Sequence, residues 1–285
     1  MTVKAVGVVG SGIMGGGITE VAAAGGHEVI LRSRSLGSAE DTLAAIGRSF
    51  DQQVDKGRLD PADRAVTLSR ISVTSDLNDL AECDIVIESV VEELGTKQRL
   101  FAELDQICAA HTILATNTST LPVVELAMET SRPDKVCGVH FFNPAPLMSL
   151  VEIVRPITAA DETVAEAKSF AEACGKTAIV VKDQAGFVVN ALLFPYLNNA
   201  VRLLEGGVAS MEDIDEAMKG GCGFPMGPFA LLDLVGLDTT ISILDALYAE
   251  QRETAHSPVP RLRRMVAAGR LGRKSGEGFY RYSRS

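Results

Sequence analysis

Long apolar runs are missing from this chain. No stretch approaches the roughly 20 consecutive apolar residues that a helix needs to cross a bilayer, although 46% of the 285 residues are hydrophobic. The apolar run near the N-terminus is short and interrupted by glycines, so it has no signal-peptide pattern. We therefore expect a cytoplasmic protein that has no membrane partner.

Paired cysteines and an excess of positive charge are also missing. The five cysteines lie far apart, and no two have the spacing of a metal site or a redox pair. Reduced thiols and no bound metal are therefore expected. The 27 basic and 37 acidic residues give a formal net charge of −10, which argues against nucleic acid as a partner. Any anionic ligand must then be held by local donors.

Glycine, in contrast, is concentrated near the N-terminus. The pattern G-x-G-x-x-G begins at Gly10, between a predicted strand over 4–9 and a predicted helix over 13–25, and a second apolar strand over 29–31 follows. In dinucleotide-binding units the first glycine permits a tight turn, the second lets a pyrophosphate approach the backbone, and the third lets the helix pack close to the strand. The helix N-terminus also offers unpaired N–H groups to the phosphates. An alternative is a glycine-rich turn with no ligand. The residues assigned to the cofactor site here are Gly10, Gly12, Ile13, Met14 and Gly15.

Strand and helix patterns alternate up to about residue 184, and only helical periodicity follows. This order predicts an α/β fold: a Rossmann-type, doubly wound, mainly parallel sheet over 1–184, then a smaller all-helical domain over 185–285. We assign the substrate pocket and dimerisation to the helical domain, because apolar helices of this kind often bury surface against a second copy. The later strands are expected at 84–89, 113–115, 136–140, 150–154 and 177–181. The later helices are expected at 38–56, 94–108, after 122, at 161–175 with Asp161 as the cap, at 187–205, from a Ser210 cap to 220–221, at 228–247 and at 260–268.

Four polar residues lie at element ends where a ligand on the glycine loop could meet them: Ser119, His140, Glu152 and Asn190. Each has a structural alternative. Ser119 could cap a helix, and His140 could be a core histidine; Glu152 could face solvent, and Asn190 could lie in a hinge. The strands that carry His140 and Glu152 are joined by a proline-containing turn, so the two side chains can face each other. A carboxylate beside an imidazole fixes its tautomer and stabilises its protonated form, as a general base requires.

These residues lie in motifs by which the chain resembles the 3-hydroxyacyl-CoA dehydrogenases over essentially its whole length. The motifs are N-T-S-T at 117–120, H-F-F-N-P at 140–144, G-F-V-V-N at 186–190, G-F-P-M-G-P at 223–228 and G-R-K-S-G-E-G-F-Y at 272–280. The resemblance implies an oxidoreductase that interconverts a (3S)-3-hydroxyacyl-CoA and a 3-oxoacyl-CoA by hydride transfer with NAD(P). A short acyl chain, 3-hydroxybutyryl or acetoacetyl, is expected.

The resemblance also implies catalytic roles. His140 is expected to take the proton of the 3-hydroxyl as the general base, and Glu152 to orient it. Ser119 and Asn190 are expected to hold the reacting oxygen. A homodimer through the helical domain is implied as well.

Further binding residues are carried over from the family in the same way. Glu92, Lys97 and Asn117 are expected at the cofactor, the first two beside the nicotinamide ribose. The acyl-CoA substrate is expected to contact Ser49, Lys56, Ser119 and Asn143. Lys56 has an alternative interpretation as a solvated lysine at a helix end.

The sequence departs from the family at the adenosine ribose. Dinucleotide-binding units that use NAD carry an acidic residue at the end of the second strand, and Ser33 stands at that position between Arg32 and Arg34. A guanidinium would accept a 2′-phosphate that a carboxylate repels. We therefore assign Ser33 and Arg34 to the cofactor site and predict that NADP(H) is favoured, with NAD(H) possible. In the alternative, both arginines point to solvent and NAD still binds.

Two rival functions stay open at this point. One is a dehydrogenase of a free 3-hydroxy acid, of the carnitine or gulonate kind, which would share the glycine loop and the His–Glu arrangement. The other is a non-catalytic dinucleotide-binding protein, which would have no need of a base with an orienting carboxylate.

Overall fold

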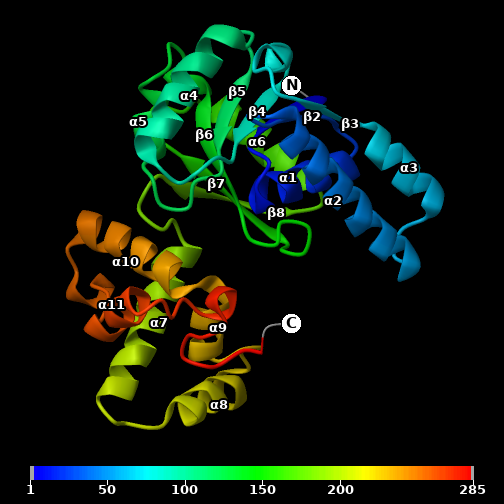
Figure 1. The fold of residues 1–285 in the computed structure, drawn as a ribbon. Helices are drawn as coiled ribbons and strands as arrows, with labels where there is room; N and C mark the ends of the chain where they lie inside the picture. Colours follow the sequence, from blue (N-terminus) through cyan, green and yellow to red (C-terminus); the bar gives the residue numbers. More distant parts are fainter. Residues whose placement is uncertain (1–2, 284–285) are drawn as a thin grey trace. The chain divides into compact units, whose positions relative to one another are not determined.

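The computed structural model describes residues 3–283 and divides into two compact units, Met1–Gln184 and Ala185–Ser285 (Figure 1). Each unit has its own hydrophobic core. Within residues 3–283, no helix is both long and apolar enough to cross a bilayer. The same residues contain no group of three or more His, Cys, Asp or Glu side chains that could hold a metal ion.

The first unit is built on one eight-stranded sheet with the order β3-β2-β1-β4-β5-β6-β7-β8. All neighbouring strands are parallel except β6 and β7, which are antiparallel. This confirms the predicted Rossmann-type, mainly parallel sheet. Strand order reverses between β1 and β4, and ligands of open α/β sheets bind outside the carboxyl ends of the strands at such a point. The strands are β1 Ala5–Val9, β2 Glu28–Arg32, β3 Ile71–Thr74, β4 Ile85–Glu88, β5 Ile113–Thr116, β6 Val136–Phe141, β7 Leu150–Arg155 and β8 Thr177–Lys182.

Successive side chains of a strand point to opposite faces of the sheet. The strands here carry apolar residues on both faces, so helices cover the sheet. Val6 and Val8 of β1 share one buried cluster with Ile18 of α1, Phe50 of α2 and Phe170 of α6. The helices of this unit are α1 Ile13–Ala24, α2 Leu36–Asp55, α3 Pro61–Ser69, α4 Leu94–Ile107, α5 Val123–Ala127 and α6 Asp161–Ala173, with short 3-10 turns at Asn78–Leu80 and Pro133–Lys135.

One predicted cap is wrong. Asp161 is the first residue of α6, the N-cap is Ala160, and no side chain caps the helix. The Asp161 carboxylate instead lies 2.5 Å from Nη2 of Arg155 at the end of β7. The carboxylate of Asp161 thus pairs with Arg155 and does not cap the helix. Sequence spacing alone does not reveal this ion pair.

The second unit is helical. Its helices are α7 Val189–Glu205, α8 Met211–Cys222, α9 Pro228–Val235, α10 Leu237–Gln251 and α11 Pro260–Ala267, with 3-10 turns at Thr254–His256 and Arg273–Ser275. The single helix predicted over 228–247 is two helices, because Gly236 has a φ of 101° that breaks the helical path. The α8 helix starts at the predicted Ser210 cap but passes through 220–221 to Cys222.

Two buried aspartates anchor the C-terminal motif to this helical core. Asp233 of α9 accepts hydrogen bonds from the backbone N–H groups of Phe279 and Tyr280, both at 2.8 Å, and from the Tyr282 hydroxyl at 3.0 Å. Asp215 of α8 accepts from the Tyr280 hydroxyl at 3.0 Å and from the backbone at the start of α9. The motif at 272–280 therefore closes the helical unit.

Candidate active site

The glycine loop follows β1 and leads into α1. A Cβ on Gly15 would lie 1.8 Å from the carbonyl oxygen of Gly10, and a Cβ on Gly10 would lie 2.4 Å from that of Ser89. Nothing lies within 4 Å of a Cβ built on Gly12, which is the uncapped N-cap of α1. Close backbone packing thus requires the first and third glycines. The second leaves open space over the first N–H groups of α1, where a phosphate fits.

The end of β2 carries no carboxylate. Ser33 is buried, and its Oγ lies 2.8 Å from Oγ of Ser11 in the glycine loop. Arg32 donates through Nε to the carbonyl oxygen of Ser75 at 3.3 Å. Arg34 is exposed and makes no hydrogen bond or ion pair with the residues that the structure describes. Its guanidinium is therefore available to an anion at this edge of the sheet.

The antiparallel pairing of β6 with β7 sets His140 directly opposite Glu152. Cβ atoms in such pairs are about 4.5–5.5 Å apart, within reach of a side-chain hydrogen bond. His140 Nδ1 lies 2.8 Å from Glu152 Oε2, and His140 Nε2 lies 3.1 Å from Ser119 Oγ. His140 is 3% exposed and Glu152 is fully buried. Three of the four predicted catalytic side chains therefore meet in the first unit.

Asn117 joins this group through the backbone. Its Oδ1 accepts a hydrogen bond from the N–H of Phe141, the residue after His140, at 2.8 Å. The predicted cofactor residue thus ties the loop after β5 to the end of β6. Asn190, the fourth predicted catalytic residue, is buried near the start of α7 in the second unit.

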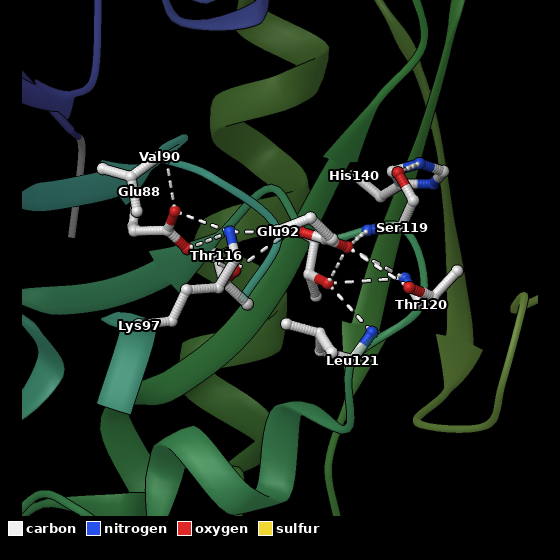
Figure 2. A network of polar contacts seen from close by, with 10 residues as sticks. Glu88, Val90, Glu92, Lys97, Thr116, Ser119, Thr120, Leu121 and His140 are labelled. Atoms are coloured by element: carbon white, nitrogen blue, oxygen red, sulfur yellow. Dashed lines mark hydrogen bonds and ion pairs between the residues drawn. The ribbon is translucent and has the colours of Figure 1, made fainter. Parts of the chain in front are cut away.

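Glu92 and Lys97 lie in a polar network that holds the loop carrying Ser119 (Figure 2). Glu92 Oε1 accepts hydrogen bonds from Thr118 Oγ1 at 2.6 Å and from the N–H of Ser119 at 2.9 Å. Glu92 Oε2 lies 3.2 Å from Lys97 Nζ, and the side chain of Lys97 is only 1% exposed. Both predicted cofactor residues are thus bound to protein groups.

The predicted CoA residues occupy two places. Ser49 of α2 donates to Oε1 of the buried Glu20 on α1 at 2.9 Å, and Gln53 donates to the same oxygen. Lys56 is exposed at the C-terminal end of α2, seven residues and about two turns beyond Ser49, so both share one helix face. Asn143 is exposed in the connection between β6 and β7.

Three further residues in the contacts around the site, Glu88, Thr116 and Lys176, were not predicted from the sequence. Glu88 is the buried last residue of β4 and bonds to Lys97 and Thr116. Lys176 donates through Nζ to the carbonyl oxygens of Ala145 at 2.8 Å and Met148 at 2.9 Å, so it holds the connection between His140 and Glu152. A charged residue inside a buried strand was a usable signal for Glu88, because a buried carboxylate requires partners. No local pattern marks Thr116 or Lys176.

A sheet of this order with a glycine loop at its first turn defines a class, the Rossmann-type dinucleotide-binding proteins. This chain adds a buried histidine–carboxylate pair. The family model of the 3-hydroxyacyl-CoA dehydrogenase NAD binding domain matches residues 5–184, and that of the C-terminal domain matches residues 186–282. The chain belongs to the 3-hydroxyacyl-CoA dehydrogenase family, which confirms the resemblance, and its cofactor is a nicotinamide dinucleotide.

Relatives match along almost the full length. The 3-hydroxybutyryl-CoA dehydrogenase of Clostridioides difficile is 44% identical over 97% of this chain and 99% of its own. The human mitochondrial hydroxyacyl-coenzyme A dehydrogenase is 44% identical over 98% of this chain and 91% of its own. The crystal structure of (S)-3-hydroxybutyryl-CoA dehydrogenase PaaH1 from Ralstonia eutropha is 41% identical, with a TM-score of 0.97 and coverage of 99% of this chain and 100% of that chain.

The network around Glu92 makes stability depend on pH. Burial by itself raises the pKa of Glu92, but the Lys97 charge and the hydrogen bonds from Thr118 and Ser119 outweigh it, so the pKa lies below its ordinary value of 4.5. The stabilisation is therefore fully present above about pH 4.5 and is lost as the pH falls through the lower, native pKa. For Glu92→Gln we expect a lower Tm than wild type at pH 7 and a difference that shrinks toward zero on acidification.

Thermal melts of both proteins between pH 7 and pH 3 measure this difference. Glu103→Gln is the matched control, since Glu103 is an exposed glutamate of α4 without a hydrogen bond or ion pair to residues 3–283. A Tm difference for Glu92→Gln that stays constant with pH would contradict the assignment.

Proposed function

We propose that the protein interconverts a (3S)-3-hydroxyacyl-CoA and the corresponding 3-oxoacyl-CoA, with 3-hydroxybutyryl-CoA and acetoacetyl-CoA as the preferred pair. The observation that carries this proposal is His140 held between Glu152 and Ser119 at the end of β6. The names of the relatives from C. difficile and R. eutropha support the short acyl thioester.

A role in proton transfer or in binding the reacting oxygen is proposed for each of these side chains. With Glu152 accepting Nδ1–H of His140, Nε2 is the unprotonated ring nitrogen, and it would take the proton of the substrate 3-hydroxyl. The buried carboxylate then stabilises the imidazolium that forms. The Ser119 hydroxyl lies 3.1 Å from the same nitrogen and would hydrogen-bond the reacting oxygen. Asn190 of the helical unit is proposed as a second ligand of that oxygen. The nicotinamide, when bound, supplies the hydride chemistry at C3.

The substrate and cofactor contacts are proposed on the same basis. The N–H groups of Ile13 and Met14, over the open space beside Gly12, would hold the cofactor pyrophosphate. Lys56 would bind a phosphate of CoA, because it is an exposed cation on a chain of net charge −10. Ser49 and Asn143 would contact the same substrate.

The test is the oxidation of reduced cofactor, followed at 340 nm with acetoacetyl-CoA, free acetoacetate or no substrate. We expect turnover with the thioester alone. For His140→Ala we expect a loss of about 10²–10⁴-fold in kcat with unchanged cofactor affinity, which is the usual contribution of general acid–base catalysis.

His111→Ala is the matched control, because His111 also lies beside a carboxylate, 3.6 Å from Asp84, but 39% of its side chain is exposed. This variant should retain wild-type turnover. Equal turnover with free acetoacetate would favour the free-acid dehydrogenase, and no turnover with either substrate would favour the non-catalytic protein. Near-native activity of His140→Ala would remove the base assignment.

We further propose that NADP(H) is used at least as well as NAD(H). The support is the absence of a carboxylate at Ser33 and the exposed, unengaged Arg34 beside it within the described chain. A hydrogen bond to a charged group contributes about 1.5–3 kcal/mol net, which corresponds to roughly 10–150-fold in affinity. We expect Ser33→Asp combined with Arg34→Ile to shift the ratio of kcat/KM for NADPH over NADH downward by a factor in that range.

The measurement is kcat/KM with both reduced cofactors on acetoacetyl-CoA. Arg48→Ile, at an exposed arginine within α2, controls for loss of surface charge alone. A wild-type protein that strongly favours NADH, with the double variant unchanged, would contradict a role for Arg34.

The helical unit is also proposed to form a homodimer. Its surface carries apolar side chains with large exposed fractions, among them Leu192 at 72%, Val208 at 69% and Leu234 at 50%. If these side chains form a continuous patch, it would favour association with a second copy. Sedimentation velocity should give twice the 30.2 kDa of the chain, and a monomer at micromolar concentration would contradict the proposal.

A further inference from the structure

Glu88 is a carboxylate in an unusual place. It ends β4, its side chain is fully buried, and it pairs with Val9 of β1 on one side and Thr116 of β5 on the other. It therefore lies where the strand order of the sheet reverses. A buried carboxylate is costly unless its oxygens are paired and hydrogen-bonded, so the partners of Glu88 indicate its function.

Both carboxylate oxygens of Glu88 are engaged (Figure 2). Oε1 accepts from the N–H of Val90 and from Lys97 Nζ, both at 2.6 Å. Oε2 accepts from Lys97 Nζ at 2.8 Å and from Thr116 Oγ1 at 2.7 Å. One side chain thus joins β4, the loop that follows it, α4 and β5.

Two routes lead from Glu88 to the loop that carries Ser119. In the first, Lys97 Nζ also contacts Glu92, whose other oxygen accepts the N–H of Ser119. In the second, Thr116 Oγ1 donates to Glu88 and accepts the N–H of Thr118 at 3.2 Å. The backbone N–H groups of two consecutive loop residues, Thr118 and Ser119, therefore donate to side chains that contact Glu88 or its partner Lys97.

The charges explain why Glu88 is needed. Two carboxylates share one ammonium, and Lys97 Nζ lies closer to Glu88, at 2.6 and 2.8 Å, than to Glu92, at 3.2 Å. This division leaves Glu92 Oε1 free for the loop. Without the charge of Glu88, Glu92 would be the only carboxylate left to pair with the ammonium among those that contact it here, and Glu92 is also the group that holds the Ser119 loop.

We propose that Glu88 is a positioning residue that, through Lys97 and Thr116, fixes the 117–120 loop and hence Ser119 beside His140. The inference rests on the proposed roles of Ser119 and His140. It also gives the buried Lys97 a function other than contact with the cofactor.

The first experiment is Glu88→Gln, which removes the charge and keeps the shape. A misplacement of about 1 Å in a catalytic group can cost about 100-fold, so we expect kcat with acetoacetyl-CoA to fall by about 10- to 100-fold. The dissociation constant of the reduced cofactor, measured by its fluorescence, should change by less than about twofold. An unchanged kcat, or a weakened cofactor affinity with unchanged kcat at saturation, would overturn the proposal.

The second experiment asks whether Glu88 acts through Ser119. In a Ser119→Ala background, the further change Glu88→Gln should lower kcat by less than about twofold, because the group being positioned is already gone. Effects that multiply in the double variant would mean that Glu88 acts by another route, and would overturn the proposal.

Two more variants complete the design. Asp105→Asn is the matched control. Asp105 is a buried carboxylate on α4, the helix that carries Lys97, and lies about 12 Å beyond Lys97 along the helix axis; it binds Arg132 and the N–H of Ser131. It should lower the Tm and leave kcat unchanged.

Thr116→Val removes the second route without removing charge, and should lower kcat by about 3- to 10-fold even where Glu88→Gln fails to fold. A wild-type kcat for Thr116→Val would overturn the inference, whereas a wild-type protein without turnover would overturn the proposed function itself.

Discussion

The antiparallel pairing of β6 with β7 is the constraint on which the site depends. Parallel strands need a crossover of a dozen or more residues, whereas the connection over 142–149 is short and reverses the chain at once. The reversal sets His140 opposite Glu152 with both side chains buried. Lys176 then holds the connection through its carbonyl oxygens. The antiparallel pair in this otherwise parallel sheet therefore brings together the histidine and the carboxylate that are proposed as the base and its orienting group.

Buried charge is the second organising feature of the first unit. The chain is acidic overall, and several of its carboxylates lie in the interior, each with partners. Glu152 binds His140, and Glu88 binds Lys97. Glu20, held by hydroxyl and amide donors, is the less compensated case, and burial raises its pKa. A buried carboxylate is costly unless its oxygens are paired and hydrogen-bonded, so the geometry of the site depends on the partners of these three side chains.

The sequence predicted the sheet and the facing of His140 and Glu152 because both depend on local patterns. Apolar runs identify buried strands, and a short turn between two of them requires antiparallel neighbours. The polar network escaped prediction because its members come from β4, α4 and β5, and only tertiary packing brings Lys97 to Glu88. The same reason accounts for Asp161, whose carboxylate binds Arg155 in place of capping α6. The break at Gly236 was missed since a lone glycine within an apolar helical pattern is compatible with a continuous helix.

The glycine loop after β1 contacts the polar network at the turn that follows β4. The carbonyl oxygen of Ser89, the residue after Glu88, is the group that excludes a Cβ from Gly10. The backbone of this turn therefore packs against the dinucleotide loop at Gly10. The side chain of Glu88, the residue before Ser89, fixes the position of the Ser119 loop through Lys97 and Thr116. Backbone packing and side-chain charge are separable at this position, because replacing the carboxylate by an amide leaves the contact of Ser89 with Gly10 in place. The position of the glycine loop and the position of Ser119 can thus vary independently, although both depend on contacts at the carboxyl end of β4.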